Sequence, residues 1–153
     1  MRITKFTTEI SEDHLPLLVK EKSFNYATQE ARKPQDISKM LNDLFRLNKQ
    51  TEEYVYMVCT NTAGRIIGIF ELSHGTVNLS LLSPREIYLK ALLCGAVNII
   101  ICHNHPSGDT SPSTNDFNIC NNIKKVGAVL NIPLVDFIII GESYYSFKEK
   151  SLL

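Results

Sequence analysis

Residues 96–116, with the sequence AVNIIICHNHPSGDTSPSTND, join an apolar segment, a polar loop and the start of a helix. The apolar run Ala96–Cys102 has the length and composition of a central strand that is covered on both faces. The loop that follows is rich in proline and glycine, and Ser113 then stands where a helix N-cap is expected. This stretch therefore predicts a buried strand with a polar loop at its carboxyl end and a helix beyond it.

Strand patterns occur on both sides of this stretch. The strands expected from period-two patterns or apolar runs are 15–19, 54–60, 66–72, 76–82, 134–140 and 144–147. Three of them follow one another early in the chain with short turns between them, so we expect antiparallel pairing on one side of a mixed sheet.

Two further helices are expected. One begins after Asp36, a candidate N-cap that precedes apolar residues at helical spacing. The other has Ser83 as N-cap, Pro84 at its first position and Glu86 placed to complete a capping box, and it ends at Gly95. Because strands and helices interleave, the fold class is α/β with a mixed central sheet flanked by helices.

Composition limits the classes of protein that the chain can belong to. Its 153 residues are 44% apolar, which is enough for the core of one domain. We divide the chain into an N-terminal extension, 1–35, packed on or preceding the core, and a domain at 36–153. The cysteines at 59, 94, 102 and 120 form no Cys-x-x-Cys pair and are expected to be small buried residues.

Charge and hydropathy exclude several roles. Sixteen Lys and Arg balance sixteen Asp and Glu, so the formal net charge is zero. This argues against a protein whose main task is to bind nucleic acid or an anionic membrane. No apolar run approaches the ~18 residues that a membrane span needs. The amino terminus lacks the apolar segment of a secretory signal, so a cytoplasmic location is expected.

A metal site is predicted at the end of the apolar run. His103 and His105 leave the strand on one face because strand side chains alternate, and the loop brings back Asp116 in the first turn of the next helix. Two histidines and one carboxylate leave a fourth tetrahedral position for water, as in catalytic zinc sites. Each residue also has a purely structural explanation: a solvated histidine, a carboxylate that favours the helix dipole, and an N-cap serine at Ser113.

The spacing His-x-His-x(7)-Ser-x-x-Asp matches the JAMM signature of the JAB/MPN metallopeptidase superfamily. Further matching segments are SPRE (83–86), HNHPSG (103–108), LVDFIIIG (134–141) and SFKEKSLL (146–153). On these segments the chain resembles the bacterial RadC family from about Ile37 to its end. Members often carry a helix-hairpin-helix region before this domain; none is visible here, so we expect the short stand-alone form found in mobile elements.

The resemblance implies a JAB/MPN-like (deaminase-like) three-layer fold and a zinc-dependent metallohydrolase. One Zn²⁺ per chain would be held by His103, His105 and Asp116. The substrate would be a peptide or protein, with a metal-activated water hydrolysing a peptide or isopeptide bond. The alternative is a non-catalytic MPN-type module that binds proteins, associated with DNA repair or mobile elements.

The family mechanism also uses a glutamate as general base and a serine that donates a hydrogen bond to the developing oxyanion. Glu53, at the start of the strand 54–60, is our first choice for the base, and Glu71 at the end of the next strand is the second. Ser113 would be the oxyanion donor. A zinc deaminase is excluded, because it needs His-x-Glu and a downstream Pro-Cys-x-x-Cys pair.

Two positions depart from the family pattern. The family usually has histidine where Ser83 and Phe137 stand in this chain. Neither position belongs to the metal set, so metal binding itself is not affected. The orientation of the ligands is another matter, because groups that hydrogen-bond to metal-ligating histidines fix their tautomer and direction.

The zero net charge yields a first prediction. We expect the isolated chain to lack tight, salt-dependent binding to duplex DNA, because no basic patch is present to release counterions from the phosphates. Fluorescence anisotropy with a labelled duplex at physiological salt tests this. A sub-micromolar affinity that falls steeply as salt is added would contradict it.

Overall fold

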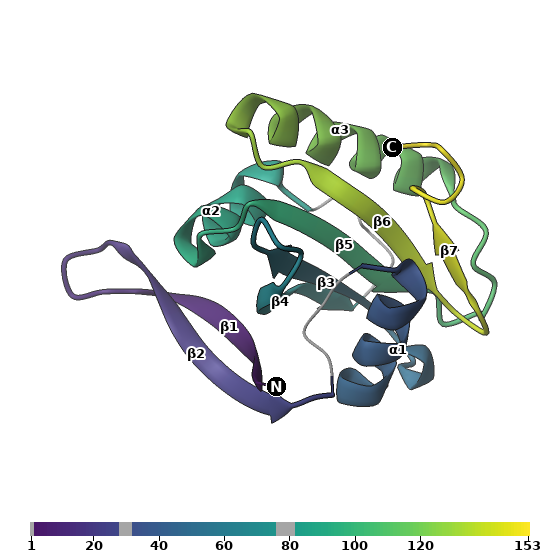
Figure 1. Ribbon diagram of the computed structural model, residues 1–153, viewed down its shortest axis with the longest axis horizontal. Coiled ribbons are helices and arrows are strands. Elements are labelled where there is room, and N and C mark those ends of the chain that lie inside the picture. The colour runs from purple at the N-terminus through teal and green to yellow at the C-terminus, as the bar shows by residue number, and fades with distance from the viewer. Residues whose placement is uncertain (1, 28–31, 76–81) are drawn as a thin grey trace.

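In a computed structural model, the described residues are 2–27, 32–75 and 82–153. They contain a seven-stranded mixed sheet with the order β2-β1-β4-β3-β5-β6-β7 (Figure 1). The strands are β1 (Arg2–Ile10), β2 (Pro16–Asn25), β3 (Glu53–Thr60), β4 (Ile66–Gly75), β5 (Asn98–Asn104), β6 (Leu134–Ile140) and β7 (Tyr144–Ser146). The helices are α1 (Pro34–Phe45), α2 (Pro84–Cys94) and α3 (Thr114–Leu130), and a short 3-10 helix, η1, spans Leu47–Lys49.

The helices cover the two faces of the sheet and make three layers. Helix α1 packs on one face through Ile37, Met40 and Leu41, while α2 and α3 pack on the other (Figure 1). The predicted α/β class, with a mixed sheet flanked by helices, is confirmed. Among the described residues, no helix is both long enough and apolar enough to cross a membrane.

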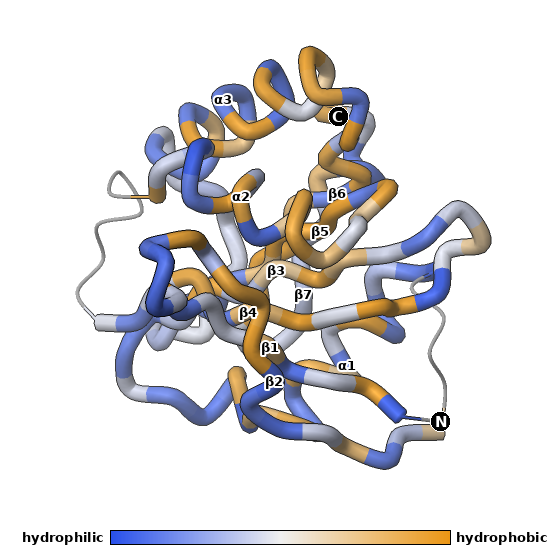
Figure 2. Tube along the Cα trace, turned by 90° about the vertical axis from the view of Figure 1, so that its left-hand side faces the viewer, coloured by the Kyte–Doolittle hydropathy of each residue, from blue (hydrophilic) through white to orange (hydrophobic). Residues whose placement is uncertain are grey.

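The central strands β3, β5 and β6 are apolar on both sides because both of their faces lie under helices (Figure 2). Strand β5 runs antiparallel to β3 and parallel to β6. Alternation sends Ile99 and Ile101 to the face under α2 and α3, and Ile100 and Cys102 to the face under α1. Cys102 therefore points away from the histidines, as its position in the strand predicted.

The N-terminal residues join the sheet as a hairpin. Strand β1 pairs in parallel with β4 through Lys5–Ile69 and Phe6–Phe70, and β2 covers its outer edge. The sequence pattern predicted only the run 15–19 here and missed β1, whose apolar residues are separated by polar ones. The expected strand at 76–82 falls almost entirely outside the described residues. The division of the chain at residue 35 stays a prediction.

Two helix starts differ in detail from the sequence prediction. Helix α1 begins at Pro34 with Lys33 as its cap, so Asp36 lies in the first turn instead of at the N-cap. The fixed φ of proline suits the first helical position, and a carboxylate in the first turn still favours the helix dipole. Ser83 does cap α2, but its side chain makes no capping hydrogen bond, so the expected capping box with Glu86 is absent.

Helix α2 ends where the sequence predicts, whereas strand β5 begins and ends later than predicted. Gly95 ends α2 in the left-handed conformation, as predicted (φ 70°). Strand β5 begins later than expected, at Asn98, and continues through His103 and Asn104, which were expected to lie in the loop. The first histidine of the motif therefore lies within the sheet, in register with Val55 of β3 on one side and Ile139 of β6 on the other.

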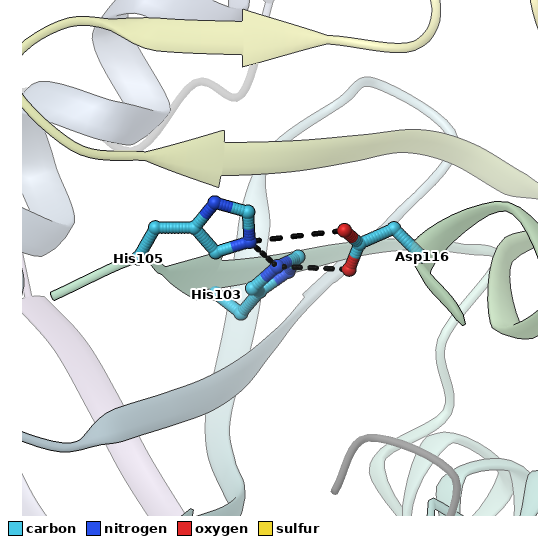
Figure 3. A group of neighbouring side chains, drawn as sticks. All are labelled: His103, His105 and Asp116. Carbon is cyan, nitrogen blue, oxygen red and sulfur yellow. Dashed lines mark hydrogen bonds and ion pairs between the residues drawn. The ribbon is translucent and has the colours of Figure 1, made fainter. Parts of the chain in front are cut away.

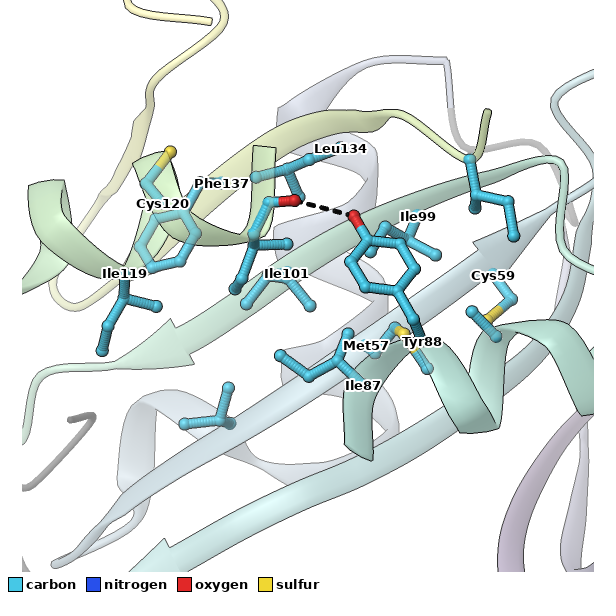
Figure 4. Close-up of a cluster of buried hydrophobic side chains, with 14 of the residues drawn as sticks. Met57, Cys59, Ile87, Tyr88, Ile99, Ile101, Ile119, Cys120, Leu134 and Phe137 are labelled. Carbon is cyan, nitrogen blue, oxygen red and sulfur yellow. Dashed lines mark hydrogen bonds between the residues drawn. The ribbon is translucent and has the colours of Figure 1, made fainter. Parts of the chain in front are cut away.

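Helices α2 and α3 approach closely at a glycine. The Tyr88 hydroxyl donates a hydrogen bond to the Ile123 carbonyl (3.0 Å; Figure 4). A Cβ atom on Gly127 would lie 2.3 Å from the Tyr88 hydroxyl oxygen and 2.6 Å from the Ile132 carbonyl oxygen. The absence of a side chain at Gly127 thus allows α3, which carries Asp116 at its other end, to lie against α2.

We expect Gly127→Ala to destabilise the protein by about 1–3 kcal/mol through overpacking, although alanine is the better helix former. The free energy of unfolding, measured with urea, tests this. Asn122→Ala, at an exposed position of the same helix, serves as the control and should leave stability unchanged or slightly higher. Equal stability of Gly127→Ala and the wild type would show that the helices adjust freely.

Candidate metal centre

The two histidines of the motif lie at the end of β5. His103 is the penultimate residue of that strand and is fully buried, and His105 follows the strand directly. The backbone N–H of His105 donates to the Ile140 carbonyl of β6 (2.9 Å), which holds the start of the loop against the neighbouring strand. Both imidazoles point toward the N-terminus of α3, where Asp116 lies (Figure 3).

Three donor atoms meet at this point. His103 Nε2 lies 3.0 Å from His105 Nε2 and 3.1 Å from Asp116 Oδ1, and His105 Nε2 lies 3.7 Å from Asp116 Oδ2 (Figure 3). Ligands about 2.0–2.1 Å from a tetrahedral ion are about 3.3 Å apart. Asp116 Oδ1 is buried and has no hydrogen-bond partner. The group has the spacing and the unsatisfied acceptor that a metal ion requires.

The hydrogen bond of His105 defines its tautomer. His105 Nδ1 lies 2.7 Å from the backbone carbonyl oxygen of Asp109. Because a carbonyl oxygen only accepts, Nδ1 must carry a proton, and in the neutral ring Nε2 then offers a lone pair. This loop carbonyl is therefore the outer contact that turns His105 Nε2 toward the metal position.

His103 lacks an equivalent outer contact. Its Nδ1 is buried without a hydrogen-bond partner. The ring packs edge-on against Phe137, with 5.4 Å between the ring centroids. Phe137 is one of the two positions where the sequence departs from the family pattern, so that departure lies directly against a candidate metal ligand, His103. The direction of His103 is set by packing and by the strand.

Ser113 and Asp116 form the first turn of α3. The Ser113 hydroxyl donates to Asp116 Oδ2 (2.7 Å), the Ser113 N–H donates to the same oxygen (2.7 Å), and the Asp116 N–H donates to Ser113 Oγ (3.2 Å). This capping box orients the carboxylate, with Oδ1 left facing His103. Burial raises the pKa of Asp116, but interactions with His103 and Ser113 outweigh it and hold the pKa at about 2.

The capping box limits what Ser113 can do. Its hydroxyl hydrogen is directed at Asp116, so donation to an oxyanion requires the hydroxyl to rotate. Ser113 does line the cleft beside the metal group. Ser113 thus lies at the cleft, and its hydroxyl hydrogen is bonded to Asp116.

Glu53 joins the metal group from β3. Its side chain is buried (9% exposed). Val55, two positions further along the same strand, pairs with His103 across the sheet. Alternation therefore puts Glu53 on the same face as His103. Burial raises the pKa of Glu53 above its usual value, and charges on His103 and His105 only partly offset this. Within the described residues, its carboxylate forms no hydrogen bond or ion pair.

Glu71, the second candidate for the base, lies elsewhere. It accepts hydrogen bonds from Lys5 (2.9 Å) and Tyr56 (3.2 Å), and it also contacts His74 (2.8 Å). Burial raises the pKa of Glu71, but the Lys5 ammonium and these hydrogen bonds bring it below its usual value. Its partner Tyr56 lies on the α1 face of the sheet. The structure does not bring Glu71 to the metal group.

The metal group opens into a cleft of about 630 Å³. Glu53, His105, Ser113 and Asp116 line it, together with Thr51, Pro106, Ser107 and Asn115. A second hollow of about 410 Å³ shares His105, Pro106 and Ser107 and extends toward Lys49 and Glu142. Sequence reasoning assigned no role to Thr51, Ser107 or Asn115, which only the fold shows to line this cleft.

Comparison with known proteins identifies the domain. The family described as "RadC-like JAB domain" matches residues 31–152. A UPF0758 protein of Clostridium tetani is 43% identical over 121 residues, which are 78% of this chain and 52% of the relative. One of Clostridium perfringens is 41% identical over 122 residues, 79% of this chain and 53% of the relative. The chain spans about half the length of the curated relatives it matches.

A mixed sheet with helices on both faces and a His-His-Asp group at the end of a central strand defines an α/β domain of the JAB class. Within that class, the chain belongs to the RadC family. The resemblance noted in the sequence is confirmed.

We expect His103, His105 and Asp116 to bind one divalent metal ion per chain. Addition of Co²⁺ to metal-free protein should produce the visible absorption of a low-symmetry, four-coordinate ion and should raise the melting temperature. His103→Ala should abolish both effects, and binding should weaken as the solution is acidified because protons compete with the metal ion for its ligands. The exposed His74 provides the control: His74→Ala should bind Co²⁺ like the wild type, and retained binding in His103→Ala would refute the assignment.

Proposed function

We propose that this chain is a zinc-dependent hydrolase of the JAMM type that cleaves a peptide or isopeptide bond. The observation that carries the proposal is the position of Glu53, a buried and unpaired carboxylate that lines the same cleft as His105 and Asp116. A purely structural metal site needs no such group, whereas hydrolysis by water needs a base beside the metal.

Zinc suits the donor set. Two imidazole nitrogens and one carboxylate oxygen, with their centre open to a cleft, are typical of catalytic zinc sites. His103, His105 and Asp116 would hold the ion. When bound there, zinc would lower the pKa of a water ligand to about 7 and polarise the carbonyl of the substrate.

The side chains of this chain would supply the proton transfers. Glu53 would accept a proton from the attacking water and return it to the nitrogen of the leaving amine. Its raised pKa suits both steps, since the carboxyl group must hold the proton between them. Ser113, after rotation of its hydroxyl, would donate to the oxygen that becomes negative as the carbonyl is attacked.

The shape of the site supports a chain-like substrate. The cleft of about 630 Å³ and the hollow of about 410 Å³ are both lined by His105, Pro106 and Ser107. A peptide segment that crosses His105 would occupy both. Lys49 and Glu142, which line the smaller hollow, offer charges of both signs to side chains of such a substrate.

The role of Glu53 is tested by Glu53→Gln, which keeps the size of the side chain and removes the base. We expect zinc content and folding to stay at wild-type levels and hydrolysis to fall by roughly 10²–10⁴-fold. A screen of peptides and isopeptides with protein purified without a metal-affinity tag supplies the substrate. In the wild type, the acid limb of kcat/KM should lie above pH 4.5, the ordinary pKa of glutamate, and should disappear in the variant.

Glu52→Gln and Glu71→Gln are the matched controls. Glu52 is an exposed carboxylate directly before Glu53, and Glu71 is already paired with Lys5, so both variants should keep full activity. Loss of activity in Glu71→Gln but not in Glu53→Gln would move the base to Glu71. If zinc binds normally and neither variant changes hydrolysis, the JAMM mechanism does not operate here. If zinc binds normally and no substrate is cleaved, a metal-holding interaction module becomes the better account.

A further inference from the structure

Asn104, the residue between the two histidines, has its side chain in the sheet and not in the metal centre. It is buried, with 1% of its surface exposed. Its Oδ1 accepts a hydrogen bond from the backbone N–H of Tyr54 (2.7 Å), and its Nδ2 donates to the backbone carbonyl of Glu52 (2.9 Å). These two contacts lie on either side of Glu53 along the chain.

The contacts replace backbone pairing at the end of the sheet. The last register pair between β3 and β5 is Val55 with His103. Two residues on, the backbone N–H of His105 bonds to Ile140 of β6. The Asn104 carboxamide offers one acceptor and one donor to β3, as a peptide group would, and so extends the attachment of β3 to β5 as far as Glu52.

Both hydrogen bonds lie on the edge of β3 that faces β5, and they hold the backbone on either side of Glu53. In a strand, the backbone groups of residues i and i+2 point to the same edge, so Glu52 and Tyr54 both face β5. Glu53 faces the opposite edge, where it pairs with Gly75 of β4. Asn104 therefore ties the segment that carries Glu53 directly to the strand that carries the histidines.

We propose that Asn104 is a positioning residue that holds the Glu53 carboxylate at a fixed place relative to His103 and His105. The inference rests on the proposed function, because it gives Glu53 the role of base. Position matters for such a group, since a shift of about 1 Å in a reacting group costs about 10² in rate.

Aspartate, serine and glutamine cannot make both of these hydrogen bonds from this position. Aspartate keeps the shape and the acceptor for Tyr54, but it has no donor for the Glu52 carbonyl and brings a charge against it. Serine offers a single hydroxyl, and glutamine is one methylene longer. Asn104→Ala removes both hydrogen bonds and leaves the metal donors in place.

Asn61 offers a matched control at the other end of the same strand. Its Oδ1 accepts hydrogen bonds from the backbone N–H groups of Ala63 and Arg65, both at 3.0 Å, in the turn after β3. Asn61→Ala therefore also removes two hydrogen bonds between a side chain and the backbone, but far from the metal centre. A general loss of stability should appear in both variants. A change confined to the candidate site should appear only in Asn104→Ala.

The experiment combines Asn104→Ala with Glu53→Gln in a double-mutant cycle. Hydrogen exchange of the Tyr54 amide is measured by NMR for each protein. The visible absorption of bound Co²⁺ is followed as a function of pH, and the pH at which its change is half complete is taken as the pH midpoint. The constants kcat and KM are measured on the substrate found by the screen. Asn104→Asp, which keeps the shape and one hydrogen bond, is carried through the same cycle and decides the matter if the alanine variant does not fold.

We expect Asn104→Ala to bind one Co²⁺ per chain, to exchange the Tyr54 amide faster, and to lower kcat by about 10- to 100-fold with little change in KM. The pH midpoint of the Co²⁺ absorption should differ from that of the wild type. In the Glu53→Gln background, Asn104→Ala should cause no further change in kcat or in this midpoint. Equal effects in both backgrounds, or a wild-type kcat and midpoint in Asn104→Ala, would overturn the inference. Full activity of Glu53→Gln would instead refute the proposed function, and with it the role given to Asn104.

Discussion

The buried carboxylate of Asp116 is the constraint on which the site depends. Its side chain is fully excluded from solvent, and an unpaired charge in such a place costs several kcal/mol. One oxygen is satisfied by two hydrogen bonds from Ser113, and the other faces His103 at 3.1 Å. The first turn of α3 and the end of β5 must therefore meet at one point, and the loop between them has to bring the chain back to it.

The sheet explains why one glutamate belongs to the site and another does not. Glu53 and Glu71 lie on adjacent strands, yet their side chains reach opposite faces. On the α3 face, no cation among the described residues pairs with Glu53, and burial raises the pKa of its carboxyl group. On the α1 face, Lys5 neutralises Glu71, and its pKa falls despite burial. Two identical side chains thus acquire opposite acid–base behaviour from the face they occupy and from their neighbours.

Much of the fold follows from local patterns. Proline at the start and glycine at the end delimit α2, and the apolar runs of β3, β5 and β6 identify the strands that are covered on both sides. The strand β1 was missed because β1 alternates weakly and gains its stability from pairing with β2 and β4. The capping box at Ser83 was predicted wrongly, since the side chain of Glu86 contacts Arg85 and the Ser83 hydroxyl makes no cap. Local rules state which partners are possible, and solvent and neighbours select among them.

The same division applies to the site. The local pattern was enough to bring the three candidate metal donors together, because alternation in a strand and the first turn of a helix place His103, His105 and Asp116 with little help from the rest of the chain. It also reduced the base to two glutamates. The fold shows that Glu53 lines the cleft beside the candidate metal group while Glu71 is paired with Lys5, and it shows the hydrogen bonds from Asn104 to the backbone around Glu53. The reason is physical: strand β3 precedes β5 by about 50 residues, and which atoms meet across that separation depends on strand pairing, register and the shared core.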